Sequence, residues 1–272
     1  MWRPACKTLT VLSLFVLVAG CADAPGPVSL DTRGVNPAVD YSPLAGVLDA
    51  AVGEDNRLSP RMLEESSETL LRQVKLLAVA GPTVTSELFD SVDAELAYWY
   101  NARAAWAMKL ALDSGCPRRM DRAELVDRPF PLDGRTMTLA DIDDLLEDYD
   151  DFRVLAASPG VCMQRAELPR KPFSSEDIRE RVAERFERFI DDHDRLRIDV
   201  AKRAIYFPPV LWRMRNRITE RYENNYGARG AKLSTAILPH VSGDGARRLR
   251  NAVGYECVPA VSRWEPALLV ED

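Results

Sequence analysis

A segment from about Ser86 to Asp113 constrains the fold more than any other, because apolar side chains occupy nearly every face of the helix that it predicts. A helix that is apolar all round must be covered on all sides, so it belongs at the centre of a globular domain. The chain can supply that cover, since 46% of its residues are hydrophobic and 29% are charged, as in soluble globular proteins. We therefore expect the remaining elements to pack around Trp99, near the middle of this helix.

Most of the expected surrounding elements are helices. Thr138 has the features of a helix N-cap, with Asp141 three residues later, and Ser174 has those of another cap. Apolar side chains recur at helical spacing in several further segments, which lie at residues 59–80, 174–190, 210–222, 233–241 and 245–253. Pro208 and Pro209 are typical of a helix start before Val210, and Gly227 is typical of a helix end.

The expected strands are few and short. Leu196–Val200 and Ala204–Phe207 form two alternating runs that predict a hairpin, and Val154–Ala157 predicts a short buried strand. The Asp133-Gly134 pair predicts a tight turn. We expect these runs, with a segment near Cys257, to give a predominantly helical single α+β domain with a small antiparallel sheet. The Trp99 helix is expected to lie beneath that sheet and the Val210–Tyr222 helix.

The first 21 residues have the features of an export signal. A charged start with Arg3 and Lys7 precedes an apolar stretch that is too short to span a bilayer, and small residues follow before Cys21. The sequence Val18-Ala19-Gly20-Cys21 resembles the lipobox of bacterial lipoproteins. The resemblance implies cleavage before Cys21 and fatty acids, such as palmitate, on its sulfur. The alternative is an ordinary signal peptide that ends near a cysteine.

This interpretation divides the chain into three parts. Residues 1–20 are the expected lipoprotein signal peptide, residues 21–58 are the lipidated cysteine and a flexible tether rich in Pro, Gly, Asp and Ala, and residues 59–272 are the globular domain. The predicted location is the cell envelope, with the membrane as a partner through the lipid on Cys21. Ala22 in place of Asp favours the outer membrane if the organism is Gram-negative.

The charge pattern argues against nucleic acid as a partner. The chain carries 36 Lys and Arg against 42 Asp and Glu, a net charge of −6. We interpret the arginine-rich stretches Arg213–Arg221 and Arg247–Arg250, and the acidic stretch Asp141–Asp151, as solvated helix faces. The acidic stretch lacks the glycine and ligand order of a calcium loop, so no metal site is expected. The glycines form no phosphate-cradling pattern, and no cofactor is expected.

Three cysteines remain after the predicted processing, namely Cys116, Cys162 and Cys257. In an oxidising compartment an odd number predicts one disulfide and one free thiol, and spacing leaves the pairing open. A cysteine-based metal site fits poorly, because the spacings are long and the chain has only two histidines.

Several segments between residues 86 and 269 occur in a recognisable order. They are Ala97–Ala102, Leu139–Asp143, Val154–Ser158 with Cys162 soon after, the hairpin ending at Phe207, the aromatic helix Val210–Tyr222, and Arg263-Trp264-Glu265. This order resembles the family called domain of unknown function 547 (DUF547). The chain departs from the family pattern in four places. Leu155 stands where a histidine would fall, and Arg103 and Ala104 stand where Tyr-Asn would fall. Cys162 is one residue late and is followed by Met163 rather than proline, and Arg263-Trp264 preserves only the tryptophan of the family's C-terminal Tyr-Asp-Trp.

The sharpest catalytic hypothesis is a nucleophilic Cys162, presented by the turn after the predicted strand. Such a thiol needs a nearby base, and only His193 and His240 are available. A disulfide or a buried hydrophobic role for Cys162 is the structural alternative.

Two polar residues complete the candidate site around Trp99. Asn101 lies on an otherwise apolar helix, where a buried amide needs hydrogen-bond partners, and it is expected to orient Ser158 or to brace the helix. Two functions follow from these residues. The preferred one is a non-catalytic envelope lipoprotein that binds a partner, and the alternative is a thiol-dependent hydrolase or acyl transferase that uses Cys162.

Overall fold

The computed structural model describes residues 39–261 and 267–268 of the chain. The described helices are α1 (Ser42–Ala51), α2 (Pro60–Glu65), α3 (Ser67–Val79), α4 (Val92–Asp113), α5 (Arg122–Leu125), α6 (Leu139–Glu147), α7 (Arg153–Ala156), α8 (Ile178–Asp191), α9 (Pro209–Arg213), α10 (Arg215–Tyr226), α11 (Leu233–Ile237) and α12 (Gly243–Asn251), with 3-10 turns η1 (Ser86–Leu88) and η2 (Leu238–His240). The described strands are β1 (Phe130–Leu132), β2 (Arg135–Met137), β3 (Arg197–Asp199), β4 (Ala204–Phe207) and β5 (Glu256–Pro259). The fold is α+β and dominated by helices, as predicted.

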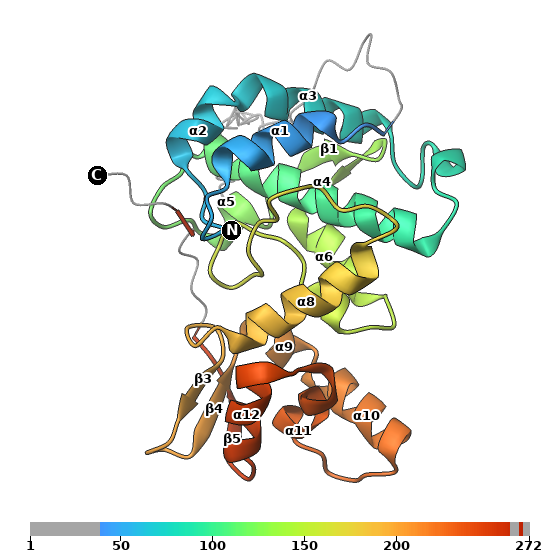
Figure 1. Cartoon of the computed structure of the whole chain (residues 1–272). Helices are drawn as coiled ribbons and strands as arrows, with labels where there is room; N and C mark the ends of the chain where they lie inside the picture. Colours follow the sequence, from blue (N-terminus) through green and yellow to red (C-terminus); the bar gives the residue numbers. More distant parts are fainter. Residues whose placement is uncertain (1–38, 262–266, 269–272) are drawn as a thin grey trace, which may run out of the picture.

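Helix α4 is the central element of the fold. Its side chains from Leu96 to Met108 are all buried, and Trp99 is 5% exposed. Its main packing partners are α3 and α6, with α2, α5 and α8 around them (Figure 1). The expected placement of Trp99 beneath a sheet is therefore wrong: helices provide the cover, because the strands are too short to span a helix of this length.

The globular part begins before Ser59, so the predicted extent of the tether was wrong. Helix α1 packs on α3, and its residues Leu44, Val47 and Leu48 are fully buried. The backbone N–H of Leu44 donates to Gln73 Oε1 at 3.1 Å. These apolar positions have helical spacing, which the Pro- and Gly-rich composition of the segment obscured.

The strands form two separate small sheets. Strands β1 and β2 make a hairpin whose turn is the predicted Asp133-Gly134 pair, with positive φ angles of 52° and 69°. Strands β3 and β4 form the other predicted hairpin, and β5 adds to β4 in the parallel direction, pairing Ile205 with Cys257. The three-stranded sheet is therefore mixed rather than purely antiparallel.

The predicted strand at Val154–Ala157 is instead the short helix α7. The backbone N–H of Val154 donates to Asp151 O at 3.0 Å, and the Asp151 carboxylate accepts from the N–H of Arg153 at 3.0 Å. These bonds start a helical turn. A run of four buried apolar residues fits either state by periodicity alone, and here the hydrogen bonds to Asp151 accompany the helical turn.

The predicted capping box at Thr138 is confirmed, since its side chain and that of Asp141 each accept from the other's backbone N–H. The predicted Val210–Tyr222 helix is two helices, α9 and α10, which meet at Met214, and Gly227 ends α10 with φ of 64°. Among the described residues, no helix has the length and apolarity needed to cross a membrane.

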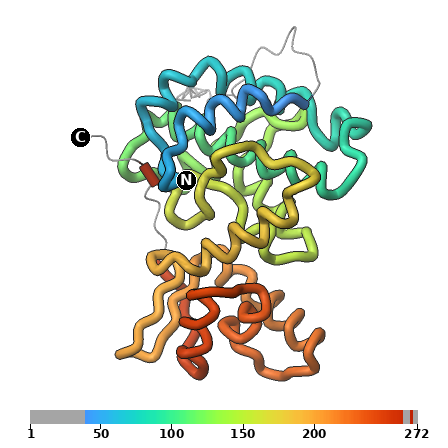
Figure 2. Tube along the Cα trace, viewed as in Figure 1, coloured from blue at the N-terminus to red at the C-terminus, as the bar shows by residue number. Residues whose placement is uncertain are grey.

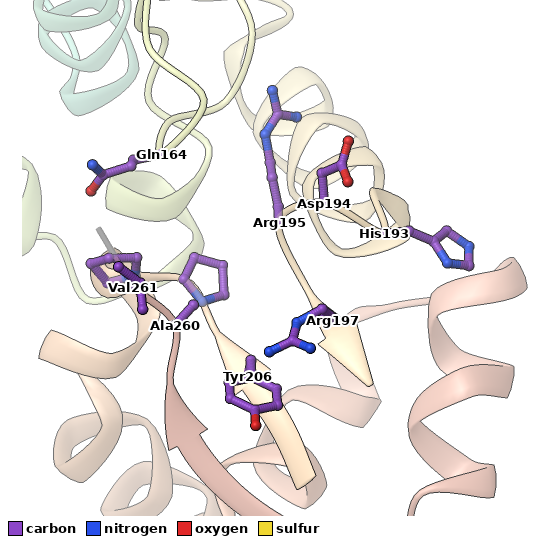
Figure 3. A pocket seen from close by; sticks show the side chains of 10 residues that line it. Gln164, His193, Asp194, Arg195, Arg197, Tyr206, Ala260 and Val261 are labelled. Carbon is purple, nitrogen blue, oxygen red and sulfur yellow. The ribbon is translucent and has the colours of Figure 1, made fainter. Parts of the chain in front are cut away.

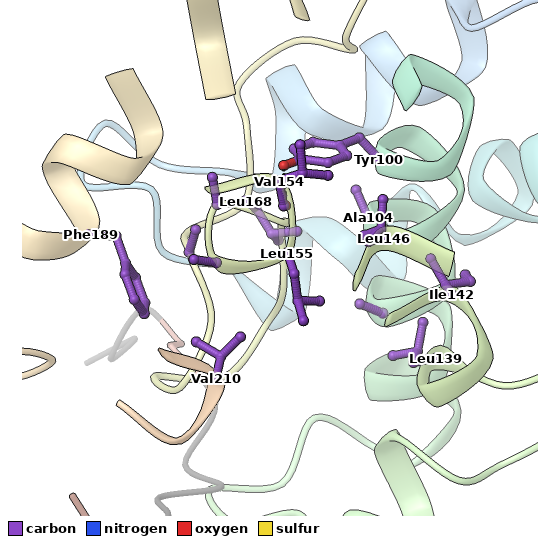
Figure 4. Packing of buried hydrophobic residues seen from close by; sticks show 14 of the residues in the cluster. Tyr100, Ala104, Leu139, Ile142, Leu146, Val154, Leu155, Leu168, Phe189 and Val210 are labelled. Atoms are coloured by element: carbon purple, nitrogen blue, oxygen red, sulfur yellow. Dashed lines mark hydrogen bonds between the residues drawn. The ribbon is translucent and has the colours of Figure 1, made fainter. Parts of the chain in front are cut away.

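Helix α8 lies between the two ends of the molecule, as Figure 1 shows. The N-terminal helices lie on one side of it, and the sheet β3-β4-β5 with α9 to α12 lies on the other. Buried side chains from both sides meet near α7, where Tyr100, Leu155, Phe189 and Val210 belong to one hydrophobic cluster (Figure 4).

The described end of the chain returns to the N-terminal side (Figure 2). The backbone N–H of Leu58 donates to Ala267 O at 2.9 Å, and that of Ala267 donates to Val161 O at 2.7 Å. The C-terminal segment thereby joins the α1–α2 connection to the loop that follows α7.

Candidate functional site

The candidate residues Ser158 and Cys162 lie in an irregular loop, residues 157–177, that connects α7 to α8. We call this segment the α7–α8 loop. Apart from an isolated β-bridge between Pro159 and Ala166, the loop forms no β-ladder or helix that would pair its main-chain N–H and C=O groups. Arginine side chains supply the missing partners, because a guanidinium can donate to several carbonyls at once.

A buried ionic cluster holds the first part of the loop. Arg103 of α4 donates from Nε to Asp143 Oδ1 of α6 at 2.8 Å and from Nη1 to the carbonyl of Pro159. Arg165 donates to Asp143 Oδ2 from the loop itself. Burial opposes ionisation of Asp143, but Arg103 and Arg165 outweigh it and hold the pKa of that carboxyl below its usual value.

Arg185 of α8 holds the second part of the loop. Its Nε donates to Ala157 O at 3.0 Å and its Nη2 donates to Glu167 O, while its guanidinium lies 5.4 Å from the centre of the Phe173 ring. Arg185 is 4% exposed, and burial lowers its pKa to about 9, which still leaves it charged at neutral pH. Arg185 forms no ion pair among residues 39–261, and the carboxylate of Glu167, whose charge opposes the lowering of the Arg185 pKa, lies 3.6 Å from Arg195 Nη1 instead.

Cys162 is 3% exposed and belongs to the hydrophobic cluster. Burial raises the pKa of its thiol, and the nearby Arg165 and Arg103 only partly oppose that effect. A buried thiol with a raised pKa is protonated at neutral pH and is a poor nucleophile.

The two histidines are held elsewhere. His193 is exposed, with Nε2 3.5 Å from Asp244 Oδ2, and the ring of His240 meets the ring of Phe152 edge-on at 5.0 Å. Neither ring has a hydrogen bond to Cys162 in the part of the chain that the structure describes. The structure therefore does not bring together the predicted Cys–His pair.

Asn101 is a brace rather than a partner of Ser158. Its Nδ2 donates to Phe173 O at 2.9 Å, and its Oδ1 accepts from the Phe173 N–H at 2.8 Å. Ser158 Oγ donates instead to Leu155 O at 2.8 Å, which closes the end of α7. Asn101 thus fixes the last part of the α7–α8 loop against the central helix, so of its two predicted roles the structure shows the brace and not the orientation of Ser158.

The predicted disulfide is absent from the described residues. Cys116, Cys162 and Cys257 are all free thiols. Cys116 follows α4, Cys162 lies in the α7–α8 loop and Cys257 belongs to β5. The three thiols therefore lie in three different parts of the fold.

The charged stretches expected to be solvated face one another. Arg213 donates to Asp144 Oδ1 at 2.8 Å and to Glu147, and Arg221 lies 2.7 Å from Asp150 Oδ1. Arg217 donates to the Tyr149 carbonyl at 2.6 Å. The arginines of α9 and α10 therefore pair with the acidic stretch, whose side chains are mostly exposed as predicted, with Asp144 67% and Asp150 92% exposed. Asp143 is the exception, because it is buried.

Two hollows flank the α7–α8 loop. The first, with a volume of about 180 Å³, lies between the loop and the β3–β4 hairpin, and we call it the hairpin hollow (Figure 3). Gln164, Arg197, Tyr206 and Val261 are among the residues that line it. The Arg197 guanidinium lies 3.8 Å from the centre of the Tyr206 ring. In Figure 3 the His193 side chain points away from the other labelled residues.

The second hollow is larger, about 440 Å³, and lies between residues 168–171 of the loop and the face of α8 that extends as far as Arg188. We call it the arginine cleft. Five basic and three acidic residues line it. The basic residues can be seen in the sequence, but only the path of the α7–α8 loop brings them together in one cleft.

No group of three or more His, Cys, Asp or Glu side chains in the described part of the chain could hold a metal ion. Comparison of the chain with protein-family models, with curated proteins and with solved structures found no match.

Proposed function

We propose that this chain is a lipid-anchored, non-catalytic binding protein of the cell envelope, built on a divergent DUF547-like domain. The proposal that the protein is non-catalytic rests on the environment of Cys162. Its thiol is buried, its pKa is raised, and neither His193 nor His240 contacts it. A thiol-dependent hydrolase or acyl transferase would need that thiol exposed and paired with a base.

The residues around Cys162 support a structural role for the loop. Arg103, Arg165 and Arg185 each donate to Asp143 or to main-chain carbonyls. Guanidinium groups used in this way fix a backbone, and a fixed backbone suits a binding surface that must keep its shape.

The hairpin hollow supports the binding role. Its lining combines prolines, Tyr206 and Val261 with the Arg197 guanidinium, and Val261 is 85% exposed. Interfaces between proteins favour aromatic and arginine side chains beside apolar area. We infer that an envelope partner covers this region.

The partner can be tested by photo-crosslinking in cells. A photoreactive residue at Val261 should give a covalent adduct of defined mass, whereas the same residue at Val84, which is 49% exposed on the N-terminal part, should not. The adduct should persist in a Cys162→Ala variant. An adduct that requires the Cys162 thiol, or the same adducts from both positions, would contradict the proposal.

The anchor can be tested by fractionation. Cys21→Ser should move the protein from the membrane fraction to the soluble fraction, because the acyl chains account for the attachment. Cys6→Ser is the matched control and should stay in the membrane fraction. Mass spectrometry of the native protein should find fatty acid on residue 21, and an unmodified Cys21 would contradict the anchor.

A further inference from the structure

The arginine cleft contains a buried cation that lacks a carboxylate partner. Arg185 lines the cleft and is 4% exposed, yet within residues 39–261 it has only the carbonyls of Ala157 and Glu167 as acceptors. A buried charge is costly unless it is paired. Two further buried arginines do have carboxylate partners, since Arg103 of α4 pairs with Asp143 and Arg195 pairs with Asp192.

The third guanidinium nitrogen of Arg185, Nη1, makes no hydrogen bond to the loop. Nε and Nη2 donate to the loop, and Nη1 has no acceptor in the part of the chain that the structure describes. Nη1 is also not among the fully buried atoms that lack a partner, so part of its surface meets solvent although the whole residue is only 4% exposed. A ligand in the cleft therefore has a donor with two N–H groups available to it.

The surrounding charges favour an anion with two charges. The cleft is lined by five basic and three acidic residues, a balance of +2. Of the acids, Asp177 already pairs with Arg181 at 3.3 Å, and Glu180 and Glu184 are exposed at the rim. Arg170 and Arg188 are exposed as well and form no ion pair among the described residues, so neither charge is taken up by a carboxylate.

We propose that the arginine cleft binds a phosphate group, either as inorganic phosphate or as a phosphate monoester, with Arg185 as the buried anchor and Arg170 and Arg188 as the rim. The guanidinium fork matches the oxygens of a phosphate, and the dianion balances the charge of the lining. The volume of about 440 Å³ exceeds what a lone phosphate needs, so an organic monoester fits as well. This inference rests on the proposed binding function and names a ligand class for it.

The test is calorimetric titration of the full-length protein with inorganic phosphate and with glycerol 3-phosphate at constant ionic strength. We expect saturable binding of one equivalent of either compound, with the monoester binding more tightly if the ligand is organic. Arg170→Gln combined with Arg188→Gln should weaken binding at least about tenfold, as expected for the loss of charge-assisted hydrogen bonds. Arg197→Gln in the hairpin hollow is the matched control and should leave the affinity unchanged.

Variants of Arg185 need a separate measurement, because this residue also braces the loop. Arg185→Lys keeps the charge but loses the planar set of guanidinium N–H donors. Its circular dichroism spectrum should show that the variant is folded, and the folded variant should bind phosphate more weakly than the wild type. Absence of saturable binding by the wild-type protein, or full binding by the Arg170 and Arg188 double variant, would overturn the phosphate site. Release of inorganic phosphate from the monoester would confirm the site and contradict the non-catalytic function.

Discussion

Arg103 and Asp143 form a salt bridge in the protein interior, with Nε 2.8 Å from Oδ1 and both side chains 3% exposed. The pair joins the central helix α4 to α6. Because Arg103 also donates to the carbonyl of Pro159, the same guanidinium holds the start of the α7–α8 loop. The position of Cys162 therefore depends on a buried ionic cluster.

Replacing Asp143 by Asn should destabilise the protein strongly, since it leaves Arg103 and Arg165 buried without their counter-ion. Breaking a buried pair in this way costs about 3–5 kcal/mol, which urea unfolding would measure. Asp144→Asn is the matched control, because the Asp144 side chain is 67% exposed and its ion pair should contribute at most about 1 kcal/mol. Equal effects of the two substitutions would contradict the role of the cluster.

The stability that Asp143 confers should depend on acid pH. Its folded pKa lies below the ordinary value of 3.8, so its contribution is fully present above that value and is lost as the pH falls through the folded pKa. The difference in unfolding free energy between the wild type and Asp143→Asn should therefore narrow below about pH 4. A difference that stays constant down to about pH 2 would show that ionisation of Asp143 does not matter.

His240 should make the protein less stable in mild acid. Burial, with the nearby Arg153 as a second cause, lowers the pKa of this histidine below 6.5, so the unfolded chain takes up the proton first. Stability from neutral His240 is present above 6.5 and is lost as the pH falls through the folded pKa. Unfolding curves of His240→Gln should lack this loss, while exposed His193→Gln should keep it.

Trp99→Ala should cost about 3–5 kcal/mol, because it removes a large side chain from the packed centre of the domain. The Trp99 ring is 5% exposed and meets the Tyr98 ring edge-on at 4.9 Å. Leu88→Ala serves as the control, since Leu88 is 46% exposed and should change the unfolding free energy by about 0.5 kcal/mol or less. A Trp99 variant as stable as the wild type would refute its central placement.

Local signals in the sequence predicted several elements correctly. The capping box at Thr138, the Asp133-Gly134 turn and the hairpin of β3 and β4 depend on a few neighbouring residues, and all three are confirmed. The central helix was predicted as well, because a continuous apolar surface leaves no other position for it.

Features that depend on distant partners were not predicted. Asp143 belongs to an acidic run whose other members are mostly exposed, and only the packing of α6 on α4 places it beside Arg103. The arginine cleft likewise requires that residues 168–171 fold back along α8. Helix α1 was missed for another reason, since the composition of its segment masked the spacing of Leu44, Val47 and Leu48.

The central claim is that Cys162 is a structural residue, and its reactivity tests this most directly. The native protein would be treated with iodoacetamide at neutral pH, and each cysteine would be followed by peptide mass spectrometry. We predict that Cys257, which is partly exposed, is alkylated while Cys162 stays unmodified until urea unfolds the protein. Alkylation of Cys162 before Cys257 in the folded protein would show an activated thiol and contradict the account.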